Sequence, residues 1–455
     1  MQRIAIINIV GLTKHHLGSN TPNITALANA SSVTILEPPL PAVTCTVQSS
    51  MLTGRSPADH GIVANGWHER ETNQTKFWQQ SNELVHGNKV WDDLRQKNSS
   101  FTVANMFWWF NMYSSADIAV TPRPIYCANG RKIPDIWTTP SSLRQSLQDK
   151  LGRFPLFNFW GPMANIKSTQ WIVDATIEVN KEHQPTLTLV YIPHLDYPLQ
   201  KFGPNHESIA KELQKMDTEV GRLIDHYQQQ GVQVCILSEY GIEEVNGAVD
   251  INRILRQSGW LKIREELGRE YLDAGASECF AVPDHQVAHV YVNDKKNIEV
   301  VANLLRKESD IEFVYVGDER GNVAHQRCGD IVVVSNSGKW FTHDWWLDAS
   351  KAPDYQATVD IHSKPGYDPR ELFLEDGWRG SKVRIAFKLL MKKLGSNTLL
   401  DIITTNSSKV KGSHGRTPAM GAPPPILIAP QCAKKMPQSL PSAALKNLCL
   451  EWINR

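Results

Sequence analysis

The sequence predicts an α/β protein with a mostly parallel central sheet, because apolar strand-length runs and amphipathic helices alternate along the chain. Residues 3–10 and 186–192 are largely apolar runs, as expected for strands that are covered on both faces. Apolar residues between 209 and 227 recur at helical spacing, and Gly231 then separates this helix from the apolar run VQVCILS. The alternation favours a sheet flanked by helices.

The other elements of the first half continue this alternation. A helix is predicted over residues 21–30, because Thr-Pro supplies an N-cap and a first-turn proline. Residues 32–36 and 101–104 predict two further strands. Residues 44–52 predict a helix that ends at Gly54.

The second half is less regular and predicts a small α+β insertion. Residues 287–292 and 311–316 predict strands on either side of a helix over 298–306. Aromatic, loop-rich segments follow from about residue 340, then a helix near 383–394 and the strand PILIAP. The predicted arrangement is therefore a helix-flanked core with a cap.

The length of 455 residues suits two or three domains, or one large α/β domain with a cap. We predict an α/β core over residues 1–250 and 405–455, and a cap or insertion over 251–404. Within the cap, DIHSKPGYDPRELF predicts an ordered lid-like loop.

Composition excludes several classes of protein. The net charge of +1 gives no strong field toward nucleic acid or an anionic membrane, and we expect no nucleic acid as a partner. The seven cysteines form no CxxC pair, which fits a reducing compartment, so we expect a cytoplasmic location. The start of the chain has the pattern of a first strand rather than of a signal peptide, and no run approaches 18 apolar residues.

Polar side chains collect where the predicted strands end. They are Thr44, His194, Asp196, Glu239 and His414. Ligands of open α/β sheets bind beyond the carboxyl ends of strands, so these segments are predicted to meet at one edge. Carboxylates, a histidine and a hydroxyl at a helix start can together hold a divalent cation and a phosphoryl group. Taken singly, each could instead be a loop cap, an ion-pair partner or a hydrogen-bonded loop residue.

Several longer motifs carry a resemblance to a known family. LTGRSPADHGIVANGW, residues 52–67, is similar to a TGRYPxxHGIxxN segment, and GSHG at 412–415 keeps a GxHG motif. PHLDYPLQKFGP and SEYGI are partial matches to EPDxxGHxxGP and SDHGM, and KVW and FW resemble two further short motifs. The chain thus resembles the nucleotide pyrophosphatase/phosphodiesterase branch of the alkaline phosphatase superfamily over nearly its whole length. It is similar in its motifs to divergent members encoded in bacterial and algal gene clusters for secondary metabolites.

The resemblance implies an alkaline-phosphatase-like core and hydrolysis of phosphodiester, pyrophosphate or related phosphoester bonds in a small phosphorylated molecule. It places Thr44 at the position of the nucleophile, whereas Cys45 and Thr46 do not align with it. The thiol of Cys45 is the more nucleophilic group, but cysteine is among the residue types most often buried, so we expect it to face the core.

The metal ligands that the resemblance implies are only partly present. Asp196 and His414 are retained, and Glu239 stands for an aspartate. The other three ligand positions hold residues that bind zinc poorly or not at all: Val10, Gln200 and Tyr240. Val47 and Gln48 occupy the positions of the family's Asn and His. Members of the family bind two zinc-type ions, and the resemblance therefore implies fewer than two divalent ions in this chain.

Three functional hypotheses follow. In the first, Asp196, Glu239 and His414 bind one zinc, manganese or magnesium ion, which acts as a Lewis acid. Glu239 then activates Thr44 or a water as a base. Weaker candidate ligands are His194, Gln200, Tyr240 and the amide oxygen of Asn8. The second hypothesis is a catalytically degenerate homologue that binds a phosphorylated or aromatic small molecule.

The third hypothesis moves the chemistry to other polar pairs. These are Asp284-His285, His289, His343-Asp344 and Asp360 with His362. His285 and His289 lie on a predicted strand about 13 Å apart, which is too far for one ion. For substrate contacts, we predict His362 and Lys364 (or Arg370) on the lid-like loop, and Trp108 in a possible aromatic pocket. The oligomeric state is left open.

Overall fold

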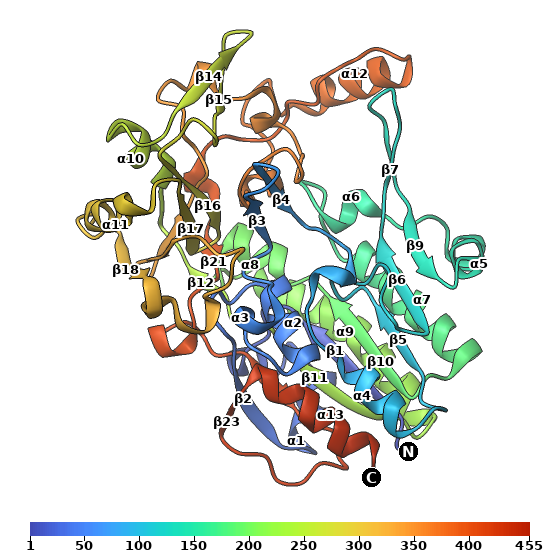
Figure 1. The fold of residues 1–455 in the computed structure, drawn as a ribbon. Coiled ribbons are helices and arrows are strands. Elements are labelled where there is room, and N and C mark those ends of the chain that lie inside the picture. Colours follow the sequence, from blue (N-terminus) through green and yellow to red (C-terminus); the bar gives the residue numbers. More distant parts are fainter.

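The computed structural model describes residues 1–455, and its core is one nine-stranded sheet (Figure 1). The strand order is β23-β2-β22-β11-β1-β10-β5-β6-β9. Their bounds are β1 Ile4–Ile9, β2 Val33–Glu37, β5 Val103–Met106, β6 Ile118–Pro122, β9 Ile136–Thr139, β10 Leu187–Ile192, β11 Gln233–Leu237, β22 Ile426–Ile428 and β23 Ser439–Pro441. β1 pairs in parallel with both β10 and β11, whereas β22 and β9 pair antiparallel with their neighbours. The predicted mostly parallel α/β core is confirmed.

Helices cover both faces of this sheet (Figure 1). One face carries α1 Pro22–Asn29, α5 Ser142–Leu151, α7 Lys167–His183 and α9 Ile209–Gln229, and the other α2 Thr44–Thr53, α4 Val90–Lys97 and α13 Leu445–Ile453. Every residue of β1 and β10 is buried, because a strand between two helical layers has no face toward water. The helices predicted over 21–30, 44–52 and 209–227 are confirmed as α1, α2 and α9.

The second half forms a smaller antiparallel sheet with the order β16-β17-β19-β18. Its strands are β16 Cys279–Asp284, β17 Val287–Val292, β18 Ile311–Val316 and β19 Ile331–Ser335, and α10 Ile251–Gln257 and α11 Ile298–Leu305 pack beside them. The strand, helix and strand predicted between 287 and 316 are confirmed as β17, α11 and β18. Their buried side chains form a hydrophobic core separate from that of the large sheet.

Shorter helices and two-stranded pairs complete the fold. The helices are α3 Pro57–His60, α6 Leu156–Phe159, α8 Asp196–Phe202 and α12 Lys382–Lys393. The strand pairs are β3 Gly66–Glu69 with β4 Gln74–Phe77, β7 Ile125–Tyr126 with β8 Lys132–Ile133, β12 Glu243–Glu244 with β21 Gly412–Ser413, β13 Gly247–Val249 with β20 Lys339–Phe341, and β14 Ile263–Glu266 with β15 Arg269–Leu272. None of the helices combines the length and the apolar character that crossing a bilayer requires.

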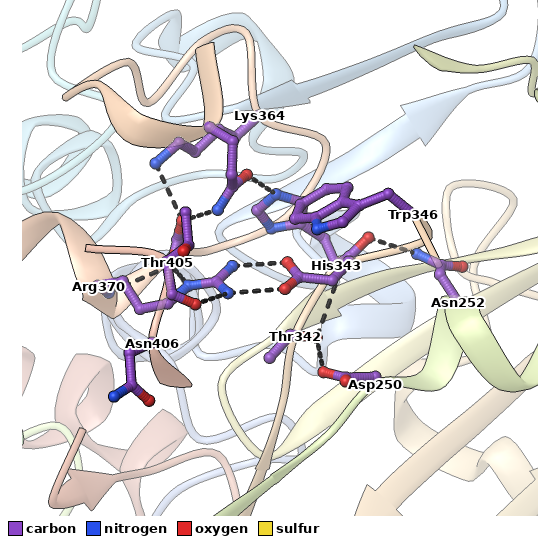
Figure 2. A network of polar contacts seen from close by, with 12 residues as sticks. Asp250, Asn252, Thr342, His343, Trp346, Lys364, Arg370, Thr405 and Asn406 are labelled. Carbon is purple, nitrogen blue, oxygen red and sulfur yellow. Dashed lines mark hydrogen bonds and ion pairs between the residues drawn. The ribbon is translucent and has the colours of Figure 1, made fainter. Parts of the chain in front are cut away.

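A buried network of charges fixes the loop that the sequence marks as lid-like (Figure 2). The guanidinium of Arg370 makes two 2.7 Å bonds to the carboxylate of Asp344 and one 2.7 Å bond to Asp368. Lys364 donates to Asp368 and also pairs with Glu371, both at 2.9 Å. All five side chains are buried, so each charge depends on these partners for solvation.

The network continues to the neighbouring elements of the cap. Thr342 donates to Asp250, which precedes α10, at 2.6 Å, and Asn252 donates to the backbone oxygen of His343 at 3.2 Å. His343 Nε2 lies 2.9 Å from the amide oxygen of Gln356. The loop is therefore held against the smaller sheet by buried polar contacts rather than by apolar packing alone.

We predict that Arg370→Ala lowers the free energy of unfolding by about 3–5 kcal/mol, because Asp344 and Asp368 lose their main cationic partner in a buried site. Urea denaturation of the purified protein measures this loss. Arg264→Ala is the matched control: its pair with Glu266 is exposed, and its removal is expected to cost about 0–1 kcal/mol. Equal losses in the two variants would contradict the assigned role of the network.

Candidate functional site

The candidate site lies where α2 begins, at the carboxyl edge of the large sheet. Thr44 is the first residue of α2 and only 3% of it is exposed. All ten residues of this helix are buried, and Gly54 ends it in a left-handed conformation with φ 68°. A helix start presents unpaired backbone N–H groups, so an anion is favoured beside Thr44.

A chain of three hydrogen bonds runs from the start of α2 to Asp284. The backbone N–H of Cys45 donates to the side-chain oxygen of Asn65 at 3.0 Å. Asn65 in turn donates to the carboxylate of Asp284 from its backbone and its amide, at 2.7 and 3.1 Å. Asp284 ends β16, so this chain of bonds joins α2 to the smaller sheet. The sequence reasoning assigned Asn65 no such role, although it lies in the quoted LTGRSPADHGIVANGW segment.

Tyr240 links Thr44 to Asp196. The Thr44 and Tyr240 hydroxyl oxygens are 3.0 Å apart, and Tyr240 donates to Asp196 Oδ1 at 3.4 Å. Burial raises the pKa of the Tyr240 phenol well above its usual value, so it stays protonated. Tyr240 follows β11 and Asp196 follows β10, two strands that both neighbour β1. The strand-end rule thus accounts for their meeting.

His414 faces Asp196 with an unpaired ring nitrogen. Its Nδ1 bonds the backbone oxygen of Ala42 at 2.8 Å, whereas its Nε2 has no hydrogen-bond partner and lies 3.9 Å from Asp196 Oδ1. Burial lowers the pKa of His414 to about 3, so the ring is neutral, and burial raises the pKa of Asp196 to about 7. A neutral imidazole that donates to a backbone carbonyl presents its other nitrogen as a lone pair.

His414 lies within a column of four closely packed rings. The ring centroids of Tyr240 and His414 are 3.6 Å apart, those of His414 and His285 are 3.6 Å apart, and those of His285 and Tyr367 are 3.7 Å apart. Tyr367 also donates to the amide oxygen of Gln200 at 3.0 Å. Sequence patterns gave no signal for this column, because its members come from four distant segments.

Glu239 is held by two amide groups. The amide of Asn8 donates to Glu239 Oε1 at 2.5 Å, and the amide of Gln48 donates to the same oxygen. Glu239 Oε2 has no hydrogen-bond partner. Burial raises the pKa of Glu239 to about 8, while the donors Gln48, Asn8 and Thr44 oppose that shift. Asn8 was predicted to lend an amide oxygen to a metal, whereas here its nitrogen serves the carboxylate.

The remaining predicted residues lie at different distances from this cluster. His194 points to Glu212 on α9, with His194 Nε2 and Glu212 Oε2 2.8 Å apart. His362 lines the cleft described next, whereas Lys364 is engaged in the buried charge network. Trp108 is fully buried in the large core; its neighbour Trp109 lines the cleft instead.

A large cleft opens from Thr44 toward α12 and the β7–β8 hairpin. Its volume is about 1690 Å³, and more than half of its lining residues are hydrophobic. Thr44, Asp196, Tyr240 and His285 lie in its wall, and the rings of Trp109 and Trp78 pack at a tilt with centroids 4.9 Å apart. The cleft therefore joins the polar cluster to an aromatic and apolar binding space.

Comparison with known proteins identifies the family of this chain. The family model for type I phosphodiesterase/nucleotide pyrophosphatase matches residues 4–368. The chain belongs to this family. A pyrophosphatase/phosphodiesterase from Schizosaccharomyces pombe, described as uncharacterized, is 22% identical over 250 residues. That match covers 52% of this chain and 44% of the yeast protein, so the chain spans less than half the length of this relative.

Solved structures agree with the fold. Mouse ectonucleotide pyrophosphatase/phosphodiesterase 5, in an inactive form in complex with AMP, superimposes with a TM-score of 0.60 at 14% identity. The human protein gives a TM-score of 0.58 at 14% identity, and each comparison covers 100% of this chain and 95% of the other. At this identity the likeness concerns the fold, and membership of the family supports a phosphoester hydrolase.

The donors present do not fit the family's two-zinc centre. Val10 has no ligand atom, Gln200 is bonded to Tyr367, and the position of Tyr240 holds a protonated phenol. No group of three His, Cys, Asp or Glu side chains is arranged to hold a metal ion. The unpaired Nε2 of His414 beside Asp196 does fit one ion, with the Thr44 oxygen and water completing its ligands.

The buried histidine of the family-like segment makes stability depend on pH. His60 Nε2 lies 2.9 Å from the hydroxyl of Ser50 on α2, and its Nδ1 accepts from the backbone of Ile62 at 3.1 Å. Burial lowers the pKa of His60 from 6.5 to about 3. The unfolded chain therefore takes up this proton first, so stability that is present above pH 6.5 is lost as pH falls toward 3.

The free energy of unfolding should fall between pH 7 and pH 5 in both proteins. We predict that this fall is about 2 kcal/mol smaller in His60→Gln than in the unsubstituted protein. The glutamine amide can still donate to Ser50 but does not titrate. Urea unfolding at the two pH values measures the difference. The same pH dependence in both proteins would show that His60 is not the group responsible.

Proposed function

We propose that this chain hydrolyses phosphodiester or pyrophosphate bonds of a small molecule, with Thr44 as the nucleophile at an atypical site for one divalent ion. The observation that carries the proposal is the position of the Thr44 hydroxyl. It stands at the start of α2, in the wall of the cleft, 3.0 Å from Tyr240 and beside Glu239. A nucleophile needs an adjacent base and an oriented hydroxyl, and this arrangement supplies both.

Glu239 is the proposed base in its ionised form, which its pKa of about 8 makes the minor form at neutral pH and the major form above pH 8. Its unpaired Oε2 can accept the Thr44 proton as the hydroxyl attacks phosphorus and the leaving group departs. The amides of Asn8 and Gln48 hold the other oxygen, so the carboxylate keeps its orientation while it carries the proton. When water cleaves the phosphothreonine, Glu239 gives this proton back to Thr44 Oγ1 as the Thr44 oxygen leaves phosphorus. The proton lost by the attacking water goes to solvent, which also protonates the first leaving group. Backbone N–H groups at the start of α2, other than that of Cys45, which donates to Asn65, would face the phosphoryl oxygens.

Asp196 and His414 are the residues that would hold the ion. Their facing atoms, Asp196 Oδ1 and His414 Nε2, are 3.9 Å apart. A divalent ion bound there would supply Lewis-acid stabilisation of charge on the phosphoryl group. The donor set of one carboxylate, one imidazole and hydroxyl oxygens suits zinc, manganese or magnesium. Glu239, the third ligand predicted from the sequence, serves as base in this proposal.

A second candidate function is binding without turnover. It is favoured by the missing ligand at Val10 and by the large aromatic cleft, which could retain a phosphorylated or aromatic ligand after catalysis is lost. For location, we propose the cytoplasm, since all seven cysteines are free thiols.

We predict that Thr44→Ala lowers the rate of hydrolysis of bis-p-nitrophenyl phosphate by at least about 1000-fold, because the covalent route is lost. Thr46→Val is the control: Thr46 is buried two residues further along α2, and its hydroxyl has no partner. That variant is expected to stay within about twofold of the unsubstituted rate, since it removes no reacting group. Full activity of Thr44→Ala would refute the proposed nucleophile, and inactivity of the unsubstituted protein with every metal would favour binding alone.

We predict that the purified protein binds at most one zinc or manganese ion per chain, because only Asp196 and His414 converge. Calorimetric titration of the metal-free protein measures the stoichiometry. Asp196→Asn and His414→Ala should each weaken the affinity by at least about tenfold. His194→Ala is the comparison variant and should bind as the unsubstituted protein does, since its ring is engaged by Glu212. Two ions per chain would contradict this geometry.

A further inference from the structure

Exposed apolar side chains gather around the mouth of the cleft. Of the 18 large hydrophobic residues that are exposed, seven lie between Trp378 and Leu399, on or beside α12. Figure 1 shows α12 at the margin of the molecule, near the tip of the hairpin that contains β7. Ile125 and Tyr126 on that hairpin are also exposed. A patch of this kind at one site of a water-facing surface marks an interaction surface.

Helix α12 has two apolar faces. Ile385, Ala386 and Leu389 line the cleft. The outer face carries Val383, Phe387, Leu390 and Leu394 at spacings of four, three and four residues, each more than half exposed. No residue of α12 is buried. Most of the outer stripe therefore faces water, although it has the pattern of a surface that packs against an apolar partner.

The charge of α12 points to one kind of covering surface. Its sequence KVRIAFKLLMKK has five basic residues and no acidic one. Arg384 and Lys388 pair with Asp401, which fixes the helix to its own return segment. Lys382, Lys392 and Lys393 have no carboxylate partner and line the cleft mouth. The net charge of +1 for the whole chain hides this local excess.

We propose that the outer face of α12, with the tip of the β7–β8 hairpin, docks on an anionic lipid surface. A helix with an apolar face on one side and lysines on the other lies in the plane of a bilayer. Its apolar face enters the acyl boundary, and its long lysine side chains reach the level of the phosphates. A second copy of this chain is a poorer occupant, because two such helices would bring like charges together. Docking places the mouth of the cleft at the lipid surface.

Sedimentation with vesicles tests this proposal. The full chain is expected to bind vesicles of mixed phosphatidylcholine and phosphatidylglycerol, and to bind pure phosphatidylcholine vesicles at least about tenfold more weakly. Raising the salt concentration should weaken binding to the mixed vesicles. Binding is measured without turnover, so a failure here leaves the proposed hydrolysis untouched.

Two variants separate the apolar and the electrostatic contributions. Phe387→Ser with Leu390→Ser removes the centre of the stripe, and Lys392→Glu with Lys393→Glu reverses two charges. Each is expected to weaken binding to the mixed vesicles by at least about tenfold. The matched control is Val300→Ser with Leu347→Ser, which are similarly exposed at 55% and 54% but lie away from the cleft, and binding should be unchanged. Circular dichroism confirms that each variant is folded.

Three results would overturn the proposal. The unsubstituted protein could fail to bind the mixed vesicles, or the α12 variants could bind as tightly as the control. In the third, light scattering shows a dimer that Phe387→Ser with Leu390→Ser converts to a monomer, which would assign the stripe to self-association.

Discussion

The centre of this protein depends on one buried carboxyl group that two amides hold by one of its oxygens. Glu239, two residues after β11, receives hydrogen bonds from Asn8 on β1 and Gln48 on α2, so it joins three elements of the core. A buried carboxyl group without donors would be costly, and the two amide dipoles meet part of this need with no net charge. The position of Thr44 follows, because Gln48 lies one turn further along the same helix.

The sequence was sufficient for the parts of the site that obey the strand-end rule. Thr44, Asp196, Tyr240 and His414 could be brought to one edge of the sheet because each follows a recognisable strand or precedes one. Contacts between side chains were beyond reach. His194 is only two residues before Asp196, yet its ring points to Glu212 on α9. Which face of a turn a side chain takes depends on packing partners that no local pattern encodes.

In the cap, too, the sequence pattern predicts the strands and helices but not the contacts between side chains. Strands β17 and β18 and helix α11 could be predicted from periodicity, since each buries one face. The loop DIHSKPGYDPRELF could be recognised as ordered, but Lys364 and Arg370 read equally well as groups that meet substrate anions. Their carboxylate partners include Asp344, which lies 26 residues before Arg370 in the chain. The burial of a charged side chain can be predicted only when the distant residues that pair with it are known.

The column of rings that contains His414 constrains which substitutions this site can accept. Tyr240, His414, His285 and Tyr367 cover one another's faces, so each ring sets the orientation of the next. A histidine in place of Tyr240 would not by itself create a second metal site, because the smaller ring would leave a gap beside His414 and the amides of Asn8 and Gln48 would still bind Glu239. A second ion would need several coupled substitutions, because changes at neighbouring positions do not act independently. Single mutations therefore do not readily turn this centre into a two-ion site.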